Sequence, residues 1–526
     1  MAFRCSSCGG NILFDIDSQS MKCQHCGSEF PPEQYQVKNK STQTDIPEAG
    51  LSLFTCGGCG AELQGTEDSA VGFCPYCGGQ SLLQTGSDSE NETEFVLPFQ
   101  ISRKQCAELY RDYAKKVRYL PKDFTKSEHL DSFTGIYMPY YEYDVQMGQS
   151  HIEGTKTVES NSRYEVINTY RIDATVQGDY CGVPFDASRY LDDEIAARTM
   201  PFDKNKERPF NPAYLSGFYA DVSTVPAETY NRDAETQASQ DIVAEVGERV
   251  YAQDGIRVDP AVSYVEARTK GHHSSLLPMW FLTWRKGDRV AYAVVNGESG
   301  KVVSDLPVDM KAFGIGCAVI AAVLFAVLEL FFQPTPILTS VLSLVAGILM
   351  AASVRSSTKR IFEKETHAND KGWASGQNAP EETAQEDGQT AGKKKKKDKG
   401  GHLGLVLAII IAVFVAYGML DEGISLSAGA AVLALLYLLL SVRKVAGWQK
   451  SVPEKQPIRA ILLVLLGVIL NAAIVFISPV NDAWYYMGDA ICILILILAS
   501  VTMTKVYNIG TTRPLPKLFD REEVGS

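Results

Sequence analysis

The sequence predicts a multidomain chain: two small cysteine-rich ribbons, a soluble α+β domain, and an all-α region with six membrane spans. Two observations support this fold class. Eight of the twelve cysteines lie before residue 80 in C-x-x-C pairs, and nearly all long apolar runs lie after residue 311. The stretch between them alternates apolar and polar residues in some segments and has helical spacing in others. The whole chain has 526 residues, which leaves room for several domains.

The cysteines form an internal repeat. "FRCSSCGG" and "KCQHCGSEF" each hold one pair, as do "FTCGGCG" and "FCPYCGG", and fourteen residues separate the two pairs of each set. A shift of 51 positions maps one set onto the other, and it also maps Phe3 onto Phe54 and Gly9 onto Gly60. The first set is Cys5, Cys8, Cys23 and Cys26, and the second is Cys56, Cys59, Cys74 and Cys77.

Each set of four thiolates is interpreted as the ligand shell of one zinc ion. A ribbon of about 30 residues is too small to bury a core, so the metal supplies its folding energy. Four thiolates leave no open coordination position, so both predicted zinc sites are structural. The other interpretations are a rubredoxin-like iron site, disulfides in an oxidising compartment, and a thioredoxin-type redox pair. His25 stands where the second repeat has Tyr76, and is interpreted as a turn residue.

Composition sets the predicted boundaries of the soluble part. Polar, Pro- or Gly-containing stretches are interpreted as linkers, and an α+β domain with an antiparallel sheet follows them. Ser102 and Gln105 have capping-box spacing, which predicts a helix over 102–118. The predicted segments are ribbon 1 (1–30), a linker (31–50), ribbon 2 (51–83), a linker (84–94) and the α+β domain (95–306).

Six apolar runs predict three transmembrane hairpins, at 312–354, 403–442 and 460–504. The last span is short, and its start is placed between Trp484 and residue 490. The loop 355–402 carries eleven Lys and Arg residues and is predicted to be disordered, whereas the short turns inside each hairpin carry none. We therefore expect both termini, including the tail 505–526, to be cytoplasmic and the chain to lie in the cell membrane. The first residues, MAFRCSSCGG, lack the apolar core of a secretory signal.

No catalytic motif accompanies these features, so we expect no enzymatic activity. The chain lacks a P-loop, H-E-x-x-H, G-x-S-x-G and the kinase signature set. His272 and His273 are interpreted as turn or surface residues, and Cys106 and Cys181 as buried thiols. The pentalysine 393–397 is interpreted as a topology anchor, and attraction to anionic lipid is the second interpretation.

Several stretches carry a family resemblance. "CSSCGGNILFDIDSQSMKCQHCGSEF", "VLPFQISRKQCAELYRDYAKKV", "GIYMPYYEYDV", "NPAYLSGFYADV" and "LLPMWFLTWRKGDRVAYAVVNGESGKVV" resemble bacterial double-zinc-ribbon membrane proteins. These are similar to the zinc-ribbon membrane partner of phage-shock-type stress systems, which associates with SPFH-domain and PspA-like proteins. The likeness covers roughly residues 1–310. It implies a metal role for the eight ribbon cysteines and implies no catalytic residue. The family's ribbons also resemble those of the helicase PriA.

Three functions follow as hypotheses. The first is a membrane-anchored scaffold that docks cytoplasmic proteins, and the second is a transporter or channel with a regulatory ribbon domain. The third is nucleic-acid binding or a helicase accessory role. Residues 1–100 contain 4 basic and 13 acidic residues, and a zinc ion with four thiolates adds further negative charge, so this region repels phosphate. The six spans hold few charges; Glu329 lies near one span end and Asn471 lies mid-span.

Overall fold

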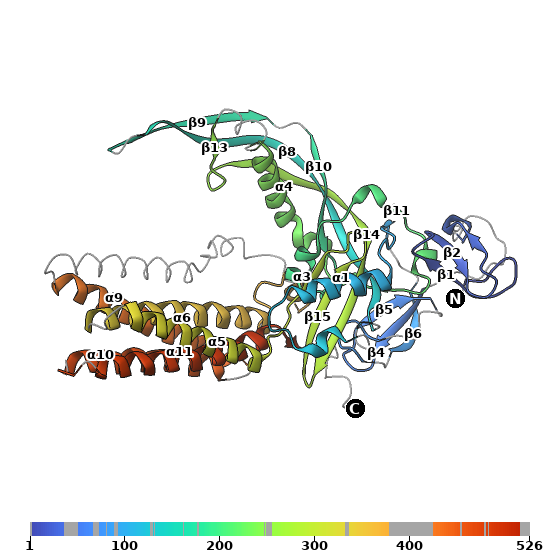
Figure 1. Cartoon of the computed structure of the whole chain (residues 1–526). Coiled ribbons are helices and arrows are strands. Elements are labelled where there is room, and N and C mark those ends of the chain that lie inside the picture. Colours follow the sequence, from blue (N-terminus) through green and yellow to red (C-terminus); the bar gives the residue numbers. More distant parts are fainter. Residues whose placement is uncertain are drawn as a thin grey trace, which may run out of the picture.

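The computed structural model has three parts in a row: a helix bundle, a large sheet, and a small N-terminal ribbon at the end away from the helices (Figure 1). The helices lie side by side and meet the sheet at one end of the bundle. The structure describes residues 3–35, 51–66, 73–79, 82–88, 93–126, 130, 132–160, 163–175, 178–246, 248, 255–331, 336–377, 424–452, 455–477, 480–481 and 483–515. The predicted span 403–420 and the pentalysine lie outside these residues.

The first ribbon is a three-stranded antiparallel sheet of β1 (Ile12–Asp15), β2 (Ser20–Cys23) and β3 (Glu29–Phe30), followed by η1 (Pro32–Tyr35). It is packed against the soluble domain. Its apolar side chains share a buried cluster with Tyr214 and Phe218. The Ser216 hydroxyl donates to the Ile12 carbonyl at 2.8 Å, which fixes β1 against η5 (Pro212–Leu215).

The large sheet contains fourteen strands among the described residues, and the second ribbon belongs to it. Strand β12 pairs antiparallel with β5 of that ribbon and parallel with β8. Most other pairings are antiparallel, as predicted; β14 with β7 is a second parallel pair. The strands are β4 (Leu51–Cys56), β5 (Glu62–Gly65), β6 (Leu82–Asp88), β7 (Phe95–Val96), β8 (Thr134–Ser160), β9 (Glu165–Thr175), β10 (Asp179–Asp186), β11 (Arg208–Pro209), β12 (Tyr219–Asp221), β13 (Arg257–Val258), β14 (Tyr264–Lys286), β15 (Arg289–Asn296), β16 (Val302–Ser304) and β17 (Arg513–Pro514).

Two segments that were expected to be a linker and a tail belong to this sheet. Strand β6 continues to Asp88 and pairs with β4, so the first half of the expected linker 84–94 belongs to the sheet. Strand β17 belongs to the expected cytoplasmic tail and pairs with β15, with Arg513 opposite Val290. Both pairings give hydrogen-bond partners to backbone N–H and C=O groups of β4 and β15 that would otherwise lie unpaired at an edge of the sheet.

Among the described residues, three α-helices pack beside the sheet: α1 (Arg103–Lys115), α3 (Asp193–Thr199) and α4 (Asn231–Val246). The expected capping box is present at α1, because the Gln105 side-chain oxygen accepts from the Ser102 backbone N–H at 2.8 Å. Helix α3 is capped by Asp192, whose carboxylate accepts from the backbone N–H groups of Glu194 and Ile195. Short 3-10 turns complete the domain: η3 (Lys122–Thr125), η4 (Lys204–Lys206) and η6 (Ala227–Tyr230).

The described bundle helices are α5 (Met310–Phe331), α6 (Pro336–Glu365), α9 (Ile424–Trp448), α10 (Gln456–Ile477) and α11 (Ala483–Gly510), with η8 (Gln449–Ser451) between α9 and α10. Their inward side chains form one buried apolar cluster, which includes Ile348, Leu438 and Ile461. Large apolar side chains also point outward; Ile315 is 67% exposed and Ile469 is 58% exposed. Apolar residues on both the inner and the outer faces are typical of helices in lipid.

Three of the described helices are long and apolar enough to cross a membrane, over Met310–Val327, Gln456–Ile474 and Ala483–Gly510. The six spans expected from the sequence are therefore not all supported. Helix α11 begins before Trp484, so the last apolar helix is longer than the run 490–504. Helix α6 continues through residues 355–365, and α7 (Lys371–Gln377) follows. The first part of the expected disordered loop is thus helical.

Candidate metal centres

The four C-x-x-C-G turns have the same backbone geometry. In each turn the glycine after the second cysteine has a φ between 68° and 82°, at Gly9, Gly27, Gly60 and Gly78. Its N–H donates to the carbonyl of the first cysteine, as from Gly9 to Cys5 at 2.8 Å and from Gly60 to Cys56 at 2.7 Å. Glycine adopts this conformation without the steric penalty of a Cβ atom, so the internal repeat preserves the turn as well as the sulfurs.

The turns bring the predicted ligands together in two clusters, and all eight predicted cysteines take part. One cluster contains Cys5, Cys8, Cys23 and Cys26, and the other contains Cys56, Cys59, Cys74 and Cys77. Sulfurs within each cluster lie within 4.8 Å of one another. The Cys8 and Cys23 sulfurs are 3.5 Å apart, and the Cys59 and Cys74 sulfurs are 3.7 Å apart. Four sulfurs at the usual Zn–S distance stand about 3.8 Å apart, whereas a disulfide is about 2.05 Å long. Each set therefore suits zinc.

The first cluster lies at the surface. Cys5 and Cys23 are buried, whereas Cys8 and Cys26 are exposed. The residues at the tips of its two turns, including Ser7 and His25, are exposed as well. His25 lies outside the group of metal-ligating side chains found among the described residues, which agrees with its interpretation as a turn residue.

The second cluster is enclosed by the sheet domain, and its four cysteines are at most 1% exposed. Tyr76, the counterpart of His25, is 1% exposed and donates to the Asp221 carboxylate at 2.5 Å. Tyr292 of β15 donates to the Tyr76 carbonyl at 2.6 Å, and Thr283 of β14 donates to the Pro75 carbonyl. Burial raises the pKa of Asp221 to about 7. This metal turn is therefore held by three strands of the sheet.

For the other cysteines and histidines interpreted from the sequence, some expected positions agree with the structure and others do not. Cys106 is buried, as expected, but Cys181 on β10 is exposed, because its side chain faces away from the packed side of the strand. His272 and His273 lie within β14 rather than in a turn, because that strand begins at Tyr264; His272 is exposed, and His273 is partly buried.

His273 belongs to a group of three possible metal ligands with Glu142 and Glu207. Lys204 already lies 2.7 Å from the Glu142 carboxylate, and His273 lies 3.1 Å from the same oxygen. The hydrogen bond to Glu142 raises the pKa of His273. Burial, followed by the nearby Glu142 charge, raises the pKa of Glu207 to about 7. Lysine and histidine thus supply the positive charge for these acids, and the group is an ion-pair network.

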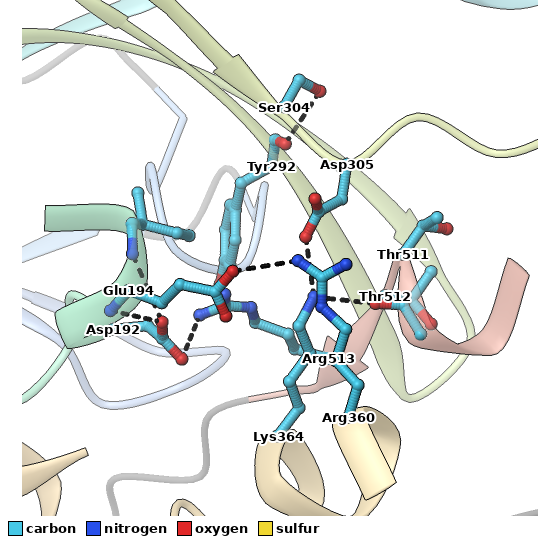
Figure 2. Close-up of polar contacts among 12 residues, drawn as sticks. Asp192, Glu194, Tyr292, Ser304, Asp305, Arg360, Lys364, Thr511, Thr512 and Arg513 are labelled. Atoms are coloured by element: carbon cyan, nitrogen blue, oxygen red, sulfur yellow. Dashed lines mark hydrogen bonds and ion pairs between the residues drawn. The ribbon is translucent and has the colours of Figure 1, made fainter. Parts of the chain in front are cut away.

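A second charged network joins the sheet domain to the base of the helix bundle (Figure 2). Lys364 of α6 donates to Asp305 at 2.7 Å, and Arg198 of α3 lies 3.2 Å from the same carboxylate. Burial opposes the charge of Asp305, but Lys364 and Arg198 hold the pKa of that carboxyl below its usual range. Arg360 pairs with Glu194 at 3.0 Å.

The same contact surface includes the chain after α11. Arg513 pairs with Asp192 at 2.6 Å, and Arg289 pairs with Glu365 at 2.5 Å. The side-chain amide of Asn508 accepts from the Val308 backbone N–H at 2.8 Å and donates to the Val308 carbonyl at 2.9 Å. Charged partners far apart in sequence give no local pattern, so sequence reasoning missed this surface. The available signal was the density of basic residues directly after an apolar run.

Comparison with known proteins gives one distant relative. The chain is 24% identical over 340 residues to the uncharacterized protein YdjG of Bacillus subtilis (strain 168), covering 63% of this chain and 97% of YdjG. No protein-family model matches the sequence, and no solved structure matches the chain.

Proposed function

We propose that this chain is a membrane-anchored zinc-ribbon scaffold that docks cytoplasmic proteins at a bacterial cell membrane. The position of the first four-cysteine cluster carries the proposal. It lies at the end of the molecule opposite the helices, with the tips of its turns exposed (Figure 1). A rigid, closed metal turn offers a surface for binding rather than a position for chemistry.

The proposal includes both zinc ions as structural elements. In each cluster four thiolates complete the coordination shell, so neither ion would have a position for water or substrate. Residues 3–35, the described ribbon with the η1 turn that follows it, contain two basic residues, Arg4 and Lys22, and four acidic ones, Asp15, Asp17, Glu29 and Glu33. This charge favours a protein partner over nucleic acid.

The anchor in this proposal has six spans, with both termini cytoplasmic. The contacts of Lys364 on α6 with Asp305, and of Arg513 after α11 with Asp192, support the cytoplasmic placement of those two helix ends, because both lie beside the soluble part. Reporter fusions after residues 335, 422 and 485 should lie outside the cell, and fusions at 380 and 450 inside. A single inverted reporter would remove the hairpin arrangement.

The resemblance names the class of partner: SPFH-domain or PspA-like proteins of a membrane-stress response. The test uses the tagged full chain in detergent, with Gln24→Ala and His25→Ala combined. Both side chains are exposed, so the fold and the zinc content should be unchanged. We expect at least an approximately tenfold loss of the co-purifying SPFH-domain or PspA-like protein, as for a binding hot spot.

The matched control is Asp112→Ala with Lys115→Ala on α1, an exposed pair whose removal should leave recovery unchanged. Equal recovery of the partner with both double variants would assign docking to another surface. Salt-sensitive DNA binding by the full chain would instead restore the nucleic-acid hypothesis.

A further inference from the structure

A cavity of about 510 Å³ lies inside the sheet domain, and no cysteine of either cluster lines it. Strands β8 and β10 and helices α3 and α4 contribute to its wall. Asn369 and Lys371, from the segment between α6 and the start of α7, complete it. The volume is within the range of small-molecule sites, about 300–1,000 Å³.

The wall of the cavity has more acids than bases. Glu142, Asp186, Asp193 and Asp233 line it, together with the bases Lys204 and Lys371. Three of the four acids have partners of their own. Glu142 pairs with Lys204, and Asp233 pairs with Lys371. Asp193 accepts from the Tyr230 hydroxyl and from the Lys371 backbone N–H, each at 2.8 Å.

Asp186 is different. It is 3% exposed, and its Oδ2 atom has no hydrogen-bond partner among the described residues. Burial raises the pKa of Asp186 well above its usual range, and the neighbouring Asp193 and Asp370 charges act in the same direction. A buried acid without a donor lowers stability, and such a group is retained at sites that bind a ligand. The Tyr140 hydroxyl, on a residue 1% exposed, belongs to the same cavity wall and also lacks a partner within the described part of the chain.

The rest of the wall is aromatic and apolar. Phe185 stacks on Tyr230 with ring centroids 4.9 Å apart, and Phe202 lies edge-on to Tyr140 at 6.5 Å. Leu277 and Met200 add apolar surface. A buried acid oxygen without a partner, set among aromatic rings, suits an ammonium group on a hydrocarbon body, because the ammonium supplies the missing donor and favours the ionised acid, while the rings attract an organic cation.

We propose that this cavity binds a small organic ammonium ligand, with its charged nitrogen at Asp186 and its hydrocarbon part against Phe185 and Phe202. A divalent metal fits less well, because Asp186 belongs to none of the groups of converging metal-ligating atoms among the described residues. The ligand would touch both α3 and the segment after α6. Helix α3 and its cap also carry Asp192, Glu194 and Arg198 of the charged contact with the bundle, so occupancy of the cavity is coupled to that contact.

Calorimetric titration of the full chain in detergent tests the proposal. The probes are n-pentylamine and cadaverine, with n-pentanol as the neutral analogue and magnesium or calcium chloride as the metal probe. We expect saturable binding of an amine and no binding of the alcohol. Water-soluble short-chain phosphatidylethanolamine identifies the source: preference for it indicates a lipid headgroup, and preference for the simple amines indicates a free ligand.

Asp186→Asn should weaken amine binding at least about tenfold, the value of one charge-assisted contact. It should also keep or raise the thermal midpoint, because the variant removes a buried acid without a donor. Asp179→Asn, on the same strand but exposed and paired with Lys270, is the matched control and should bind normally. Equal amine affinity in both variants, no amine binding to the natural chain, or saturable binding of the metal alone would overturn the proposal.

Discussion

The two four-cysteine ribbons share one backbone design but occupy opposite kinds of environment. Every metal turn has the same geometry: a glycine with positive φ after the second cysteine, and a hydrogen bond back to the first. The first cluster leaves Cys8 and Cys26 exposed, whereas the cysteines of the second are all buried. The difference lies in what surrounds each turn, which a repeat in sequence does not record.

Position 25 and its counterpart 76 show how the two environments arise. His25 is an exposed residue of a surface turn. Tyr76 enters the core of the sheet, where its hydroxyl donates to Asp221 and its carbonyl accepts from Tyr292. The second metal turn has therefore become part of the domain core, whereas the first presents its tips at the surface. One repeat thus supplies a buried cluster and a surface cluster.

Removing one ligand from each cluster tests this comparison most directly. Cys77→Ser should unfold the second ribbon and disrupt the sheet through β5 and β12, because zinc binding contributes on the order of 10 kcal/mol to such sites. That is comparable with the stability of a whole domain, about 5–15 kcal/mol. Cys26→Ser should lose the first zinc and leave the sheet folded. Metal analysis and thermal unfolding of the detergent-solubilised chain measure both.

The natural chain should contain two zinc ions, and the Cys26→Ser variant about one. Equal damage to the sheet by the two substitutions would show that the first ribbon is as structural as the second. Bound iron, or a metal content near zero, would contradict the zinc assignment itself.

The two clusters should release zinc to a chelator at different rates. A chelator reaches the first site directly at Cys8 and Cys26, but reaches the second only after the sheet opens locally. Since each 1.4 kcal/mol of opening free energy is about a tenfold factor, we expect release from the second site to be at least about a hundredfold slower. Stopped-flow measurement with a colorimetric zinc chelator would show two phases of equal amplitude. A single phase would mean that the clusters are equally protected.

The sequence was sufficient to identify the eight cysteines that gather in two clusters, because the shift of 51 positions relates every ribbon cysteine to its counterpart. It also predicted α1, since the Ser102–Gln105 cap is a local signal. It could not predict the different burial of the two clusters. That depends on β12 pairing with β5, and these strands are far apart in sequence.

The base of the bundle was missed for the same reason. The sequence interpretation placed Arg360 and Lys364 in a disordered loop, because Lys and Arg after an apolar run are typical of membrane topology signals. In the structure they continue α6 and pair with Glu194 and Asp305, 166 and 59 residues earlier in the chain. Counting charges correctly indicates a basic segment, but only the fold shows that acids of the sheet domain neutralise it. The Asp186 cavity likewise depends on residues from several segments that are separate in sequence.

The smallest expected difference between the two ribbons is in how pH changes the free energy of unfolding. Burial raises the pKa of Asp221 to about 7, above an unfolded value of about 3.9, so the folded state binds more protons between these values. The free energy of unfolding should therefore fall as pH rises from about 6 to about 7, by no more than about 1.4 kcal/mol per pH unit from this group. Asp221→Asn should remove that part of the pH dependence.

Other groups titrate in the same range, including Glu207, so the difference between the natural chain and Asp221→Asn is the quantity to measure. Gln24, an exposed residue of the corresponding turn in the first ribbon, does not titrate, so Gln24→Ala should leave the pH profile unchanged. Thermal unfolding at about pH 6, 7 and 8 with zinc present would compare the three proteins. If Asp221→Asn followed the natural profile, or if Gln24→Ala flattened it, the buried carboxyl beneath the second metal turn would not be the titrating group, and the contrast between the two ribbons would rest on burial alone.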